Sequence, residues 1–175
     1  KSLSDEYFAT RRMAAEAVGA IGQAAKAELP ALVKSIADPT NRETAVFAML
    51  AAVEIAPEDP TIVTALIERL DSSSDVVRKG AATALGKIGP EAKAAVPALR
   101  KALYEKRNLI EYPVATAAVK ALGEIGPAAR VAAPRIREML TSKKVTNTYF
   151  YRVELAESLW RIAGDAKTAL PILEK

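Results

Sequence analysis

The chain has 175 residues, half of them apolar but only 5% aromatic, and a formal net charge of +4 at neutral pH. It contains neither cysteine nor histidine, which excludes disulfides, thiolate nucleophiles, zinc sites built on those residues, and mechanisms that need a histidine base. Its apolar content is chiefly alanine and aliphatic residues. Because alanine favours closely packed helices, the composition predicts an all-α protein.

The sequence repeats one pattern along its length. The stretch ALGKIGPEAKAAVPALRKAL, residues 84–103, returns 37 residues later as ALGEIGPAARVAAPRIREML, with eleven of twenty positions identical. One isoleucine of this pattern serves as a reference position, and its five copies are Ile21, Ile55, Ile88, Ile125 and Ile162. Such self-similarity is typical of repeat arrays. We expect one array with repeats at residues 5–39, 40–73, 74–108, 109–145 and 146–175.

Each repeat is predicted to contain two helices. Apolar residues three and seven positions before the reference isoleucine form one stripe of a first helix, helix A. Helix A should end at a glycine or proline, as at Gly22, Gly89 and Gly126. Apolar residues eleven and fifteen positions after the isoleucine mark helix B, whose main body should begin near a proline. Those prolines are Pro30, Pro97, Pro134 and Pro171. In the second repeat, Asp59 and Pro60 predict an earlier start.

Three glycines lie inside helix A, two positions before the reference isoleucine: Gly19, Gly86 and Gly123. Glycine there costs about 1 kcal/mol relative to alanine, so its recurrence predicts a close approach of neighbouring backbones. Val53 and Trp160 take this position in the second and fifth repeats, where the contact must differ. A single helix pair has too little core to fold alone. We therefore expect a right-handed α-solenoid of about five stacked pairs, with the B helices lining its concave face.

The helix pair VRKGAATALGKIG and EAKAAVPALRKAL resembles the HEAT repeat, in the short bacterial form called the bilin-lyase HEAT-like repeat. The resemblance covers the chain from about Tyr7 to Lys175. It implies a non-catalytic scaffold that binds another protein, without cofactor or metal. In the family, an arginine ten positions before the isoleucine pairs with acidic groups between repeats, and here that column holds Arg11, Arg78 and Arg152.

A few relatives with this fold are enzymes. The metal-dependent hydroxylases need histidine ligands that this chain lacks, and no chromophore-handling motif of the bilin lyases is matched. The DNA glycosylases use an aromatic residue and a carboxylate in a basic groove. Trp160 and Asp165 are the residues that could take those parts here, although nothing in their spacing requires it.

Charge is distributed unevenly along the array. Residues 1–87 carry a net charge of −2 and residues 88–175 a net charge of +6. Part of the excess lies in a column five positions after the reference isoleucine, formed by Lys26, Lys93, Arg130 and Lys167. This column is either a solvated edge that keeps the protein soluble or an edge that faces an anion.

Two longer connections, residues 104–113 and 141–151, account for the 37-residue spacings and are rich in tyrosine and basic residues. Insertions in repeat arrays often lie on the binding edge, and tyrosine and arginine are over-represented at interfaces. We therefore expect partner binding by Lys93, Arg100, Tyr104, Lys106, Arg107, Arg130, Arg137, Lys143, Lys144, Tyr149 and Tyr151. Alternatively, Tyr112, Tyr149 and Tyr151 merely begin the next helix A and pack within the array.

The sequence thus predicts a scaffold that binds a partner protein through its B helices and its two long connections. The alternative is nucleic-acid binding by the basic C-terminal half, in a groove like that of the DNA glycosylases. Because the chain opens on Lys1 and its last B helix is short, we expect a piece of a longer polypeptide. No stretch predicts a signal peptide or a membrane span, and the composition leaves the compartment open.

Overall fold

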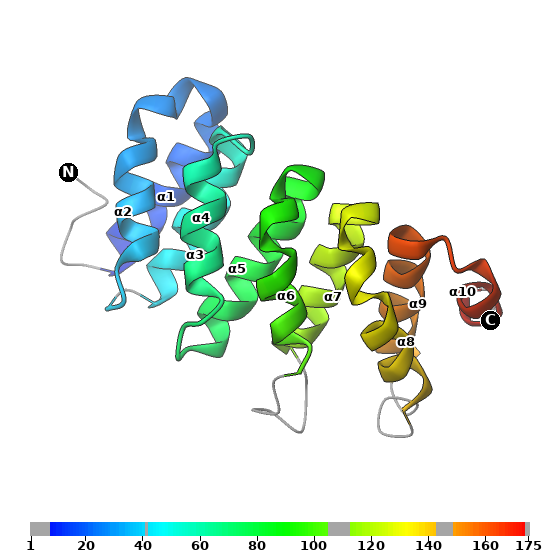
Figure 1. The fold of residues 1–175 in the computed structure, drawn as a ribbon. Coiled ribbons are helices and arrows are strands. Elements are labelled where there is room, and N and C mark those ends of the chain that lie inside the picture. The colour runs from blue at the N-terminus through cyan, green and yellow to red at the C-terminus, as the bar shows by residue number, and fades with distance from the viewer. Residues whose placement is uncertain (1–7, 41, 105–112, 143–148, 174–175) are drawn as a thin grey trace.

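The computed structural model describes residues 8–40, 42–104, 113–142 and 149–173. These residues form helical hairpins that lie side by side in sequence order, with the N-terminus at one end of the stack and the C-terminus at the other (Figure 1). The described part of the chain contains no strand, and none of its helices is long and apolar enough to cross a membrane. The predicted all-α solenoid is confirmed.

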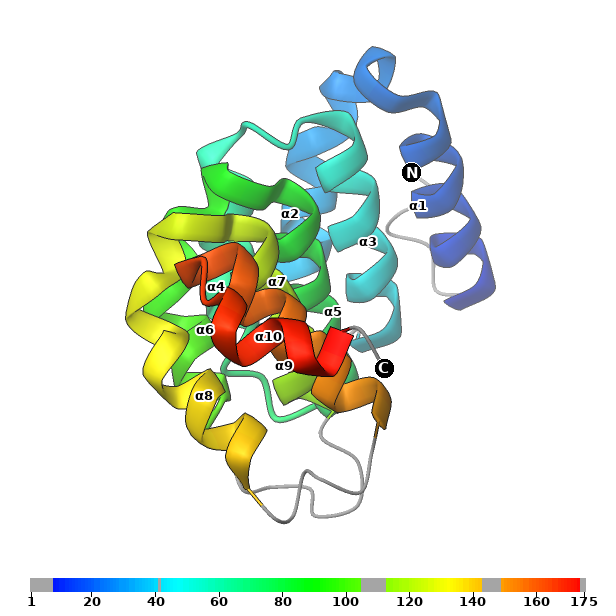
Figure 2. The same ribbon diagram turned by 90° about the vertical axis from the view of Figure 1, so that its right-hand side faces the viewer.

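Every hairpin consists of one A helix and one B helix. The A helices are α1 (Phe8–Ile21), α3 (Arg42–Ile55), α5 (Asp75–Ile88), α7 (Pro113–Ile125) and α9 (Tyr149–Ala163). The B helices are α2 (Leu29–Ala37), α4 (Pro60–Arg69), α6 (Val96–Ala102), α8 (Ala133–Thr141) and α10 (Ala166–Leu173). Short 3-10 helices join A to B in three hairpins: η2 (Gly22–Glu28), η3 (Gly89–Ala95) and η4 (Gly126–Ala132). Viewed toward the C-terminal end, α10 lies across the front of the stack (Figure 2).

The local signals in the sequence set most of these boundaries. Gly89 and Gly126 each have a φ of 74°, the left-handed conformation that ends helix A. Prolines lie in the first turns of α2, α6 and α8 as predicted. In the second hairpin, the Asp59 side chain accepts a hydrogen bond from the backbone nitrogen of Thr61 at 2.9 Å, and α4 begins at Pro60. That early start is also confirmed.

The predicted start of the last B helix is wrong. Helix α10 begins at Ala166, and Pro171 lies inside it. The reason is a competing cap: the Asp165 carboxylate accepts a hydrogen bond from the backbone nitrogen of Thr168 at 3.2 Å. This bond satisfies a free amide of the first turn, so the helix starts five residues before the proline.

The A helices contact one another through the glycine positions. A Cβ atom on Gly86 would lie 3.1 Å from Cα of Ala121 on α7, and Gly19 and Gly123 face Ala51 and Ser158 equally closely. The predicted close approach is therefore confirmed. In the fifth repeat the same position holds Trp160, which is 52% exposed, because the described residues contain no further A helix after α9.

Arg78 is the largest side chain that is fully buried in the described part of the chain. Its guanidinium donates a hydrogen bond to the carbonyl oxygen of Ser72 at 2.6 Å and pairs with Asp75, three residues away on α5. Arg78 thereby braces the polar turn that connects α4 to α5. Arg78, one of the three residues of the predicted arginine column, therefore has a structural role.

Candidate functional site

An aromatic ring and two arginines lie together on α6 and α8. Tyr104, just after α6, is 55% exposed, and the guanidinium of Arg135 lies 4.5 Å from the centre of its ring. Arg135 is held there by an ion pair with Glu138 at 2.8 Å and by a hydrogen bond to the carbonyl oxygen of Leu103 at 3.3 Å. Arg100 is exposed four residues before Tyr104. We call Arg100, Tyr104 and Arg135 the α6–α8 surface.

The geometry of this surface suits recognition of another molecule. Tyr104 follows α6 in a tight turn, in which its backbone nitrogen donates a hydrogen bond to the carbonyl oxygen of Lys101 at 3.0 Å. Because Arg135 is already fixed by its own partners, the stacked tyrosine and guanidinium lose little conformational freedom when something binds. Tyrosine and arginine bury a large area while keeping polar groups, which is why both are frequent at binding hot spots.

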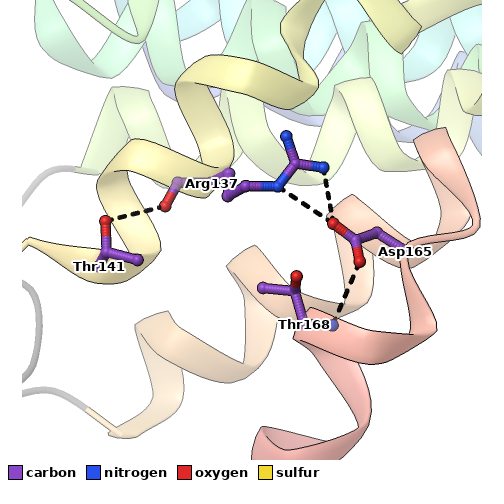
Figure 3. Close-up of polar contacts among 4 residues, drawn as sticks. All are labelled: Arg137, Thr141, Asp165 and Thr168. Atoms are coloured by element: carbon purple, nitrogen blue, oxygen red, sulfur yellow. Dashed lines mark hydrogen bonds and ion pairs between the residues drawn. The ribbon is translucent and has the colours of Figure 1, made fainter.

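Arg137, which was predicted to bind a partner, instead forms an ion pair within the chain (Figure 3). Its Nε and Nη2 atoms donate to one oxygen of Asp165, Oδ2, at 3.1 and 2.6 Å. The other oxygen of Asp165 accepts from the backbone nitrogen of Thr168. Arg137 therefore ties α8 to the start of α10. Hydrogen bonds from Arg137, and then from Thr168, lower the pKa of the Asp165 carboxyl below its usual value.

We expect acid to loosen α10. A carboxyl with a lowered pKa stabilises the fold above its ordinary pKa of 3.8, and this stabilisation is lost as the pH falls through the lowered value. Protection factors of the α10 amides, measured by hydrogen exchange, should therefore fall between about pH 6 and about pH 3. In Asp165→Asn they should already be low at the higher pH. Equal wild-type protection at both pH values would show that the ion pair does not hold α10.

The basic column of the turns does not act as one continuous feature. Lys26 forms an ion pair with Glu58 at 3.8 Å. In the second repeat, the position of the column, five residues after the reference isoleucine, is taken by Pro60 and carries no charge. Lys93 and Arg130 are exposed and form no ion pair with any described residue. The column is therefore interrupted, and its cations have different surroundings.

Apart from Tyr104, the predicted residues of the two long connections are either buried in the array or outside the part of the chain that the structure describes. Tyr151 lies in the core on α9 and is only 9% exposed, so its assignment to partner binding is corrected: it begins helix A of the fifth repeat and packs there, as the alternative held. The other residues lie outside what the structure describes, either altogether or in their side chains: Lys106, Arg107, Lys143, Lys144 and Tyr149.

Sequence reasoning missed a charge ladder on the A helices. Glu54 pairs with Lys87 at 3.0 Å, and Glu124 pairs with Arg161 at 2.7 Å. Arg161 also pairs with Glu157 on its own helix at 2.7 Å. The signal was present in the sequence, because the residue just before the reference isoleucine alternates in sign from the second repeat to the fifth. These charges of the A layer are thus satisfied within the chain.

Comparison with known proteins identifies the repeat. A family model described as HEAT repeats matches residues 30–110 and 63–148. No curated protein sequence matches the chain significantly. Among solved structures, one similar chain belongs to the complex of CpcE and CpcF of phycocyanin lyase from Nostoc sp. PCC7120, with a TM-score of 0.73 and 22% identity. The match covers 95% of this chain but only 64% of that one.

A second solved structure, of an engineered protein, is similar with a TM-score of 0.64 and 24% identity, covering 98% of this chain and 82% of that one. At these identities both matches show a shared fold. The chain spans about two thirds of the lyase chain that it resembles.

Proposed function

Since this chain belongs to the HEAT repeat family, we propose that it is a non-catalytic scaffold that binds a partner protein through its B helices. The observation that carries the proposal is the α6–α8 surface, where Tyr104 is exposed and held against Arg135. Arg100 adds a cation without an ion pair to any described residue. The proposal also includes Lys106, Arg107, Lys143, Lys144 and Tyr149 of the two long connections.

Both layers contain ion-paired cations, and the feature that favours the B helices is the exposed Tyr104 held against Arg135. On the A layer, Lys87 and Arg161 already have carboxylate partners in neighbouring repeats. On the B layer, a tyrosine and an arginine offer the groups that most often anchor protein interfaces. The similar phycocyanin lyase chain was solved as a complex of two proteins, which supports a protein partner here.

Nucleic acid is the second candidate, favoured by the net charge of +6 in residues 88–175. A nucleic-acid track needs several cations spaced along the backbone. The turn column supplies one cation per repeat in the last three repeats, at Lys93, Arg130 and Lys167, but none in the second, where Pro60 takes the position. Asp165, the carboxylate considered for a glycosylase-like role, is already bonded to Arg137 and Thr168. We therefore favour the protein partner.

Site-specific crosslinking tests the proposed function. With photoreactive benzoylphenylalanine in place of Tyr104, we expect a protein adduct from native extract that is absent when the probe replaces Thr83, an exposed residue of α5. Unlabelled wild-type chain should compete for the adduct, and Tyr104→Ala should compete at least about tenfold less well. Equal adducts at both positions would contradict the proposal. Retention on a DNA column that falls steeply with salt would favour nucleic acid instead.

A further inference from the structure

At two junctions between repeats, an acid at the same offset from the reference isoleucine forms an ion pair with the preceding repeat. The residue three positions after the reference isoleucine, here called the turn position, is Glu58 in the second repeat and Asp165 in the fifth. Glu58 pairs with Lys26 of the preceding repeat, and Asp165 pairs with Arg137 of the preceding repeat. These cations lie five and twelve positions after their own isoleucine. An acid at the turn position thus pairs with one or the other of two cation positions on the repeat before it.

The junction between the third and fourth repeats has both cations but no acid. Its turn position is Ala128, and the two cation positions of the preceding repeat hold Lys93 and Arg100. All three side chains are exposed, and neither cation forms an ion pair with a described residue. The junction between the second and third repeats has an acid but no cation. Its turn position is Glu91, and the two cation positions of the preceding repeat hold Pro60 and Ile67.

We propose that the junction at Ala128 binds a carboxylate from an acidic segment of the partner protein. The carboxylate pairs with Arg100 in the way that Asp165 pairs with Arg137, and Lys93 adds positive charge to the same junction, where η4, which carries Ala128, packs against η3 and α6. Arginine suits this role because its planar group can present two donors to a carboxylate, as Arg137 does with Nε and Nη2. This inference rests on the proposed function and specifies the chemistry of the partner.

The residues around Ala128 favour a partner segment in which an apolar side chain lies close to the acidic one. Val131, three residues after Ala128 on η4, is 56% exposed. An acidic side chain bound at Ala128 brings the adjacent part of its own chain over Val131. The segment recognised therefore combines an acidic residue with a nearby apolar one. A phosphate backbone fits this site less well, because the junction before it has no cation at the two equivalent positions.

The chain itself offers a variant that fills the site. Ala128→Asp places a carboxylate on η4, which packs against α6, at the sequence offset that Asp165 has in the fifth repeat, so it should pair with Arg100 and compete with the partner. Ala128→Asn has nearly the same shape without the charge and is the matched control. Both changes are at an exposed position, so the fold should tolerate them.

Binding is measured by fluorescence anisotropy with a labelled peptide of alternating aspartate and leucine, at low salt. We expect Ala128→Asp and Arg100→Gln to weaken binding about tenfold and Ala128→Asn to leave it within about twofold, since a tenfold change corresponds to losing one charge-assisted contact. Tyr104→Ala should weaken binding less than Arg100→Gln does.

Three results would overturn the inference: no binding of the peptide by the wild type, equal binding by Ala128→Asp and Ala128→Asn, or tighter binding of single-stranded DNA with the same dependence on Ala128 and Arg100. The crosslinking experiment separates this inference from the proposed function. If the Tyr104 adduct persists while the Ala128 variants have no effect on the peptide, the scaffold function stands and the carboxylate site falls. If the peptide binds as expected but no adduct forms, the proposed function falls.

Discussion

Replacing Gly86 with valine is expected to lower the free energy of unfolding by about 2–3 kcal/mol, the upper part of the range for overpacking a core. The first added atom already lies 3.1 Å from Cα of Ala121 and 3.3 Å from its Cβ. Backbone cannot rotate away as a flexible side chain can, so α5 and α7 must separate. A β-branched residue adds two further methyl groups to the same contact.

Urea unfolding followed by circular dichroism measures this loss, and Gly126→Ala is the control. Gly126 has a φ of 74° with nothing within 4 Å of an added Cβ, so alanine there meets conformational strain but no clash. We expect that control to cost about 1 kcal/mol. If Gly86→Val costs no more than Gly126→Ala, the spacing of the A layer is not limited by backbone contact.

The fold was predictable because it depends on short-range signals that recur. The bilin-lyase-like HEAT resemblance read from residues 77–103 agrees with the family match and with the fold of the lyase chain. Gly19, Gly86 and Gly123 predicted close helix packing, since glycine inside a helix is unfavourable unless the space requires it. Pro171 misled the prediction because a proline column alone does not reveal that Asp165 caps the helix earlier.

The candidate site was predictable only in part. An ion pair between repeats depends on the distance between side chains of two neighbouring repeats, and the sequence of one repeat does not reveal that distance. Arg100 and Arg137 occupy equivalent positions in their repeats. They differ through a residue in the following repeat, which is Ala128 for the first and Asp165 for the second. Comparing the arginine position of one repeat with the turn position of the next repeat would have shown that Arg137 has an acidic partner there and that Arg100 has none.

Replacing Arg78 with methionine is expected to lower the free energy of unfolding by about 2–4 kcal/mol. Methionine keeps most of the apolar stem but removes the donors to the Ser72 carbonyl oxygen and to Asp75. That carbonyl oxygen lies in a partly buried turn. Without the arginine it has lost water and gained no hydrogen-bond donor, which destabilises the folded state. Asp75 is about one third exposed, so water can replace part of its ion pair, and the loss stays below that of a wholly buried pair.

Arg161→Met is the matched control, because it removes ion pairs at an exposed position and should cost less. Arg161 pairs with Glu124 and Glu157, both at 2.7 Å, but its side chain is 39% exposed. Exposed pairs are screened by water and typically contribute less than about 1 kcal/mol. Arg78, at 2% exposure, has no water to take over its bonds. If calorimetry or urea unfolding gives equal losses for the two variants, then burial does not set the cost of losing an arginine ion pair in this array.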